Sequence, residues 1–133
     1  MSELAELAVR LRGFAQAREW EQFHTPKNLV MALAGEVGEL VAEFQWLTPA
    51  EAENPDPDTM ARVRAELGDV TGYLVRLADV LGVDLIAAAH VKLDESERRY
   101  PPELYRGSAR KAPPLPSCAD EDTAPSGRVG YMP

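Results

Sequence analysis

The sequence is poor in the residues that form disulfides, transition-metal sites or nucleic-acid-binding surfaces. Its 133 residues include one cysteine and two histidines, and 14 lysines and arginines stand against 22 acidic residues, for a net charge of −8. The one cysteine, Cys118, cannot form a disulfide within the chain, which is typical of a reducing compartment. Because basic side chains dominate affinity for DNA and RNA, this charge balance argues against a nucleic-acid polymer as partner.

Targeting and membrane-spanning signals are also missing. The first residues do not combine a basic segment with an apolar one, and the most apolar stretch, residues 29–47, contains three glutamates. We therefore expect a cytoplasmic protein without a membrane partner. The length suits a single domain, which we place at residues 1–112, followed by an irregular, flexible, proline-rich tail at 113–133.

No segment alternates polar and apolar residues as a strand would, and helical periodicity predicts an all-α chain. Thr25 and Pro26 are typical of a helix start, and Asp58 and Asp84 can cap two later helices. The three prolines within 48–58 predict a loop there. The expected helices, which would form a four-helix bundle, cover residues 3–20, 26–47, 59–81 and 85–100.

The second of these helices is apolar nearly all round but carries acidic residues. At about 100° per residue, Glu36 and Glu39 lie about 60° apart, and Glu43 falls between them one turn later. A helix apolar on most faces is normally buried. In so short a chain, burial on every side predicts that a second subunit covers it.

The third helix repeats this spacing with Glu66 and Asp69. If the two helices lie side by side, four carboxylates converge, and their repulsion is relieved by a divalent cation. Oxygen ligands favour Mg²⁺ or Mn²⁺ over zinc. The alternative stays open, because either acidic pair alone is common on a solvated helix face. A di-iron bundle fits poorly, since it needs Glu-x-x-His on two helices and His90 lacks a glutamate three residues before it.

Four segments together resemble a known family. In order and spacing they are similar to the MazG-like all-α nucleotide pyrophosphohydrolases, and among these to the dCTP pyrophosphatase branch. The resemblance extends from about residue 14 to residue 111. The segments are EWEQFHTPKNLVMALAGEVGELVAEFQW from residue 19, ELGDVTGYLVRLA from residue 66, VKLDESERRYP from residue 91 and RGSARK from residue 106.

The resemblance implies Mg²⁺-dependent hydrolysis of a (deoxy)nucleoside triphosphate, dCTP or a modified dCTP, to the monophosphate and pyrophosphate. Mn²⁺ is a possible substitute, and the enzyme is expected to be a homo-oligomer, a dimer or tetramer. By position, one of Glu36 and Glu39 would orient or deprotonate the attacking water. The metal ligands implied are Glu36, Glu39, Glu66 and Asp69.

The resemblance also implies where the substrate binds. Trp20, Trp46 and Tyr73 match aromatic positions around the nucleobase. Other implied substrate contacts, two of them basic and directed at phosphates, are Asn28, Lys92, Arg99 and Tyr100.

Two positions depart from the family pattern. Leu11 stands where animal dCTP pyrophosphatases have a histidine that contacts the base, and Ser96 stands where the family usually has asparagine. Two other functions remain open. One is a catalytically silent helical module for nucleotide binding or oligomerisation, and the other is hydrolysis of a different nucleotide such as dUTP or a phosphoribosyl-ATP.

Overall fold

Six helices occur within residues 1–116, the part of the chain that the computed structural model describes, and no strand occurs there. The all-α class predicted from the sequence is confirmed. The four expected helices correspond to α1, α2, α4 and α5, and two short helices are additional. The bounds are α1 Glu3–Gln16, α2 Pro26–Phe44, α3 Pro49–Glu53, α4 Pro57–Leu81, α5 Leu85–Arg99 and α6 Pro102–Tyr105.

Side-chain caps fix the starts of α2 and α5 where the sequence predicts them. Thr25 Oγ1 accepts a hydrogen bond from the amide of Asn28 at 3.3 Å, and Pro26 is the first helical residue. At the start of α5, Asp84 Oδ1 accepts a hydrogen bond from the amide of Ala87 at 2.9 Å. Both caps satisfy amides that have no partner inside the helix.

The prediction that residues 48–58 form a loop is wrong for α3. Thr48 Oγ1 accepts a hydrogen bond from the Glu51 amide, and the Glu51 carboxylate accepts one from the Thr48 amide at 2.8 Å. This reciprocal capping box stabilises a short helix. Pro49 does not prevent it, because proline is tolerated in the first turn.

The start of α4 also corrects the sequence-based prediction. The capping residue is Asp56 rather than Asp58, and its Oδ1 accepts a hydrogen bond from the amide of Thr59 at 2.9 Å. Pro57 takes the first helical position, as Pro26 does in α2. Asp58 lies in the first turn, where a negative charge interacts favourably with the helix dipole.

Helix α1 ends at Gln16, four residues before its predicted end at Trp20. Glu19 adopts a left-handed backbone with φ 53°, and the amide of Trp20 donates to the carbonyl of Ala15 at 2.9 Å. This arrangement closes a helix and usually uses glycine. Because a glutamate takes the left-handed position here, the sequence carries no glycine signal for the end.

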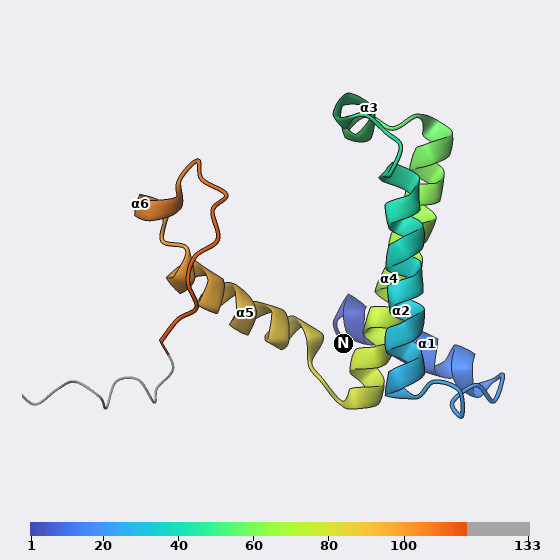
Figure 1. Cartoon of the computed structure of the whole chain (residues 1–133). Coiled ribbons are helices and arrows are strands. Elements are labelled where there is room, and N and C mark those ends of the chain that lie inside the picture. The colour runs from blue at the N-terminus through green and yellow to red at the C-terminus, as the bar shows by residue number, and fades with distance from the viewer. Residues whose placement is uncertain (117–133) are drawn as a thin grey trace, which may run out of the picture. The chain divides into compact units, whose positions relative to one another are not determined.

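Helices α2 and α4 run antiparallel and side by side, and α1 packs against α4 (Figure 1). The buried core among the described residues is small, and Leu29 is its largest fully buried side chain. Several apolar side chains of α2 remain exposed, including Val30, Val37 and Val41. The predicted burial of α2 on every side is therefore not achieved within one chain.

The chain divides into two compact units, Met1–Ala88 and Ala89–Pro133, and the division falls within α5. The domain prediction of 1–112 stays a prediction. Residues 113–116 of the predicted tail form no helix or strand, and 117–133 lie outside the described residues. Within residues 1–116, no helix is both long and apolar enough to cross a membrane.

Candidate metal centre and adjacent pocket

Three of the four predicted ligand carboxylates meet between α2 and α4. Glu36 and Glu39 lie one turn apart on α2, and Glu66 lies on the neighbouring α4. Each offers a carboxylate oxygen, and these three oxygens lie within 4.8 Å of one another. The antiparallel packing of the two helices therefore produces the convergence that the spacing predicts, in the first compact unit.

The negative charge of this cluster is poorly compensated. Glu66 Oε2 is buried and makes no hydrogen bond within the described part of the chain. Burial raises the pKa of Glu66 above its usual 4.5, and the charges of Glu39 and Asp69 raise it further. The pKa of Glu36 is also raised, by burial and then by the same neighbouring carboxylates. Carboxylate oxygens that are partly buried and lack a positive partner fit a hard divalent cation.

Asp69 and Glu43 have different relations to the cluster. Asp69 is not one of the three converging groups, although its charge contributes to the raised pKa values of Glu36 and Glu66. Glu43 instead forms an ion pair with Arg62, whose Nε lies 2.9 Å from Glu43 Oε2. Two carboxylates of the cluster, Glu36 and Glu66, are half-buried, and neither has a basic partner in the described residues.

A pocket of about 300 Å³ lies in the same unit, and its wall includes Asp69, whose charge acts on Glu36 and Glu66 of the cluster. Two of the predicted base-contacting aromatics, Trp20 and Tyr73, line it. Leu11 lines it as well. The wall is mostly apolar, and its residues are Leu7, Leu11, Phe14, Trp20, His24, Gly68, Asp69, Gly72, Tyr73 and Arg76.

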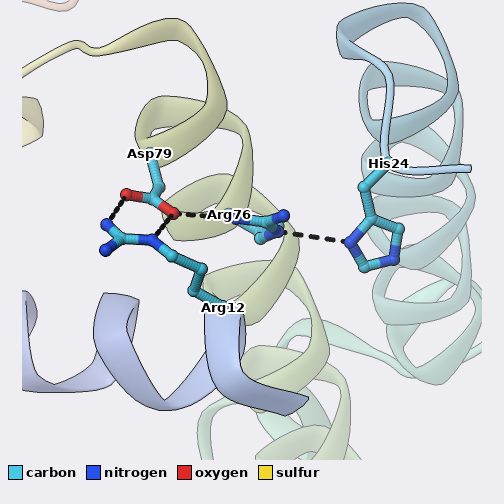
Figure 2. A network of polar contacts seen from close by, with 4 residues as sticks. All are labelled: Arg12, His24, Arg76 and Asp79. Carbon is cyan, nitrogen blue, oxygen red and sulfur yellow. Dashed lines mark hydrogen bonds and ion pairs between the residues drawn. The ribbon is translucent and has the colours of Figure 1, made fainter. Parts of the chain in front are cut away.

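A polar network supports one side of this pocket (Figure 2). Arg76 on α4 is 7% exposed, and its Nη1 lies 2.8 Å from Asp79 Oδ2. Asp79 also accepts from Arg12 Nε of α1 at 3.1 Å. Arg76 Nε donates to His24 Nδ1 at 3.2 Å. The hydrogen bond from Arg12 lowers the pKa of Asp79, and burial, followed by the charge of Arg76, lowers the pKa of His24.

The sequence analysis did not identify Arg76 or Asp79. A signal existed for Arg76, because it follows Asp69, Gly72 and Tyr73 at the three- and four-residue spacing of one helix face. Its partners could not be read from the sequence. His24 and Arg12 are 52 and 67 residues from the groups that they contact.

Two predicted substrate residues of the first unit lie elsewhere. Trp46 follows the end of α2, is 87% exposed and does not line the pocket. The side-chain amide of Asn28 donates to the carbonyl of Phe23 at 3.0 Å, and so ties the preceding loop to the start of α2. In this structure Asn28 has a local structural role.

The other predicted substrate residues belong to the second unit. Lys92 forms an ion pair with Glu95. Arg99 donates to the carbonyls of Ala112 and Pro113 at 2.7 and 2.9 Å. The Tyr100 ring packs edge-on against that of Tyr105, with 5.0 Å between the ring centroids. Arg99 therefore fastens the chain after α6 to the end of α5.

The chain matches no protein-family model, but it is similar to known proteins. It is 49% identical to human dCTP pyrophosphatase 1 over 84% of its length and 67% of that protein. The identity to bovine dCTP pyrophosphatase 1 is 47%, over 86% of the chain and 69% of the relative. A crystal structure of a pyrophosphatase from Archaeoglobus fulgidus aligns with a TM-score of 0.68 and 35% identity, over 76% of this chain and 94% of that one.

Proposed function

Because the chain belongs to the dCTP pyrophosphatase family, we propose that it hydrolyses dCTP to dCMP and pyrophosphate. The structural observation that supports this proposal is a carboxylate cluster beside a pocket with aromatic walls. The cluster suits a cation that holds phosphates, and the pocket suits a base. Their adjacency matches a substrate that contains both.

The resident ion that we propose is Mg²⁺, with Mn²⁺ as a possible substitute. Glu36, Glu39, Glu66 and Asp69 would hold it, and the buried, unpartnered Glu66 Oε2 supports this assignment. When bound, such an ion neutralises phosphate charge and makes a water molecule more acidic. Glu36 or Glu39 would orient or deprotonate the attacking water, because a general base must lie within hydrogen-bond reach of it.

We place the base in the pocket, between side chains such as Trp20 and Tyr73. Stacking on aromatic rings stabilises a base without requiring a charged partner. Lys92, Arg99 and Tyr100 remain predicted substrate contacts, as do Asn28 and Trp46. A cytoplasmic location likewise remains a prediction from the sequence.

A panel of the eight common ribo- and deoxyribonucleoside triphosphates tests the proposed function. With Mg²⁺, we expect the highest kcat/KM for dCTP and the release of pyrophosphate. Chromatography identifies the nucleotide product. Release of orthophosphate instead would contradict the proposed bond cleavage. Metal-dependent binding without any product would indicate the silent helical module, and fastest hydrolysis of dUTP would place the activity in another branch.

We also propose that α2 pairs with a second copy of the chain. Val30, Val37 and Val41 repeat at seven and four residues, so they share one face of α2, and they are 50%, 43% and 58% exposed. Exposed apolar stripes of this kind mark interaction surfaces. Two acidic ligands lie on the same helix, so pairing would also stabilise the position of the metal ligands.

Introducing charge into this stripe is expected to break the oligomer. In Val37→Asp and Val41→Asp, the carboxylate would be buried without a partner at the interface, which is strongly unfavourable. Light scattering should show a dimer or tetramer for the wild-type protein and a smaller species for both variants. Val9→Asp, at a comparably exposed position of α1, is the control. A monomeric wild-type protein, or variants of unchanged mass, would contradict the proposal.

A further inference from the structure

A basic side chain reaches the row of acidic residues between α2 and α4. Glu43 lies four residues after Glu39 on α2. Arg62 lies four residues before Glu66 on α4. Because the two helices are antiparallel and side by side (Figure 1), both steps lead in the same direction, by about one helical turn. The pair of Glu43 and Arg62 therefore lies one turn beyond the carboxylate cluster.

Glu43 lies on the face of α2 that carries the predicted metal ligands. Its angle about the helix axis falls between those of Glu36 and Glu39, and residues four apart have Cβ atoms about 5–6 Å apart. Only 19% of the Glu43 side chain is exposed. Burial is the main cause of the raised pKa of Glu66, but the charge of Glu43 contributes to it. Glu43 is therefore within reach of the cluster by a rotation of its side chain.

Arg62 instead holds the Glu43 carboxylate. Its Nε donates to Glu43 Oε2 at 2.9 Å. The guanidinium is itself held, because its Nη2 donates at 3.1 Å to the hydroxyl of Thr59, a residue that is 6% exposed. That hydroxyl donates in turn to Asp56, which caps α4. Arg62 is thus anchored to the first turn of its own helix, and Glu43 is not among the converging carboxylates.

An additional carboxylate would change which cation the cluster prefers. Mg²⁺ takes about six ligands in near-ideal octahedral geometry, and it is usually bound through few carboxylates, with water and substrate phosphates in the other positions. Ca²⁺ takes about six to eight oxygen ligands in flexible geometry. One more carboxylate would therefore favour Ca²⁺ and would occupy a position that a phosphate oxygen or a water molecule needs.

We infer that Arg62 is a positioning residue for the metal centre, which withholds the Glu43 carboxylate from the cation and so makes the site select Mg²⁺ over Ca²⁺. The inference rests on the proposed function, which places Mg²⁺ at the cluster. In this role Arg62 contacts neither the ion nor the substrate. It acts through Glu43, by keeping coordination positions open for phosphate oxygens and for the attacking water.

Removing the guanidinium tests the inference through metal binding alone. Because 56% of the Arg62 side chain is exposed, Arg62→Gln leaves the buried core intact. We expect its dissociation constant for Ca²⁺ to fall about tenfold and that for Mg²⁺ about threefold or less. Both ions gain from the lost positive charge, but only Ca²⁺ accommodates the extra ligand. Binding of Mn²⁺ to the nucleotide-free protein, followed by EPR with Ca²⁺ or Mg²⁺ as competitor, measures both constants.

Removing Glu43 as well separates this role from a structural one. In the double variant Arg62→Gln with Glu43→Gln, the extra carboxylate is absent, and we expect the wild-type preference between Ca²⁺ and Mg²⁺ to return. Arg62→Lys keeps a positive charge opposite Glu43 and should also keep the wild-type preference. The control is Arg64→Gln, which removes one positive charge at an exposed position of the same helix.

If the pair of Glu43 and Arg62 only joins α2 to α4, Arg62→Gln weakens the binding of both ions equally, and the double variant binds them no better. That result would overturn the inference, as would an unchanged preference between the two ions in Arg62→Gln. Wild-type binding of Mg²⁺ in the same titration shows separately whether the proposed metal centre exists. A wild-type protein that binds none of the three ions would overturn both proposals.

Discussion

Replacing Glu66 by glutamine is expected to abolish most metal-dependent turnover while raising the melting temperature of the metal-free protein. Glu66 Oε2 is buried without a hydrogen-bond partner, and other carboxylates lie close by. Glutamine removes a charge whose burial opposes folding when no cation is bound. The same change removes a ligand, and we expect turnover to fall by about 100-fold or more, since metal ions supply several kcal/mol of transition-state stabilisation.

The pH dependence of this effect has a defined sign. The pKa of Glu66 is raised in the folded protein, so the folded state binds the proton more tightly than the unfolded state does. The destabilisation is fully present above the folded pKa and is relieved as the pH falls through that value toward 4.5. The advantage of Glu66→Gln over the wild-type protein should therefore be largest at neutral pH and shrink under mild acid.

Thermal melts followed by circular dichroism, with and without Mg²⁺, measure both effects. Mg²⁺ should raise the melting temperature of the wild-type protein and leave that of Glu66→Gln nearly unchanged. Glu97→Gln, at an exposed position of α5, serves as the control for the loss of one negative charge. If Glu66→Gln keeps wild-type turnover, or melts lower than the wild-type protein without metal, the assignment of the cluster is wrong.

Replacing Asp79 by asparagine is expected to lower the free energy of unfolding far more than replacing its other partner, Arg12, does. Only 8% of the Arg76 side chain and 13% of the Asp79 side chain are exposed, so removing the carboxylate charge leaves a buried guanidinium without its counter-charge. Breaking such a pair lowers the free energy of unfolding by about 3 kcal/mol. In Arg12→Gln the loss should be much smaller, since the Arg12 side chain is 46% exposed and solvent screens its charge.

Urea denaturation at neutral pH tests this difference. The pKa of Asp79 is lowered in the folded protein, so its contribution is present above the unfolded value of 3.8 and is lost as the pH falls through the folded value. Asp79→Asn and the wild-type protein should therefore converge in stability under strong acid. Equal losses for Asp79→Asn and Arg12→Gln at neutral pH would show that burial does not decide the strength of this network.

Local signals in the sequence predicted most of the fold. Thr25 with Pro26, and Asp84, mark helix starts because a cap needs only residues a few positions apart. The α3 helix had a similar signal in Thr48 and Glu51, which the prolines of 48–58 masked. The end of α1 had none, because its left-handed residue is Glu19 rather than glycine.

The site was predicted in part, for a related reason. The spacing of Glu36 and Glu39, and the matching spacing on α4, required only that two helices pack side by side. The resemblance placed Trp20 and Tyr73 at a binding pocket, and the structure lines a pocket with both. The Arg76 network escaped prediction because its contacts join segments far apart in the sequence, where no periodicity operates.

The acidic cluster draws on both arms of the α2–α4 hairpin, one on each side of the α3 connection. An ion bound by side chains of both α2 and α4 would act as a reversible cross-link, and would restrict the unfolded chain much as a covalent bridge does. Removal of the ion would then destabilise the helical hairpin as well as stop hydrolysis. The concentration of the cation would therefore set the lifetime of the folded protein in addition to its turnover rate.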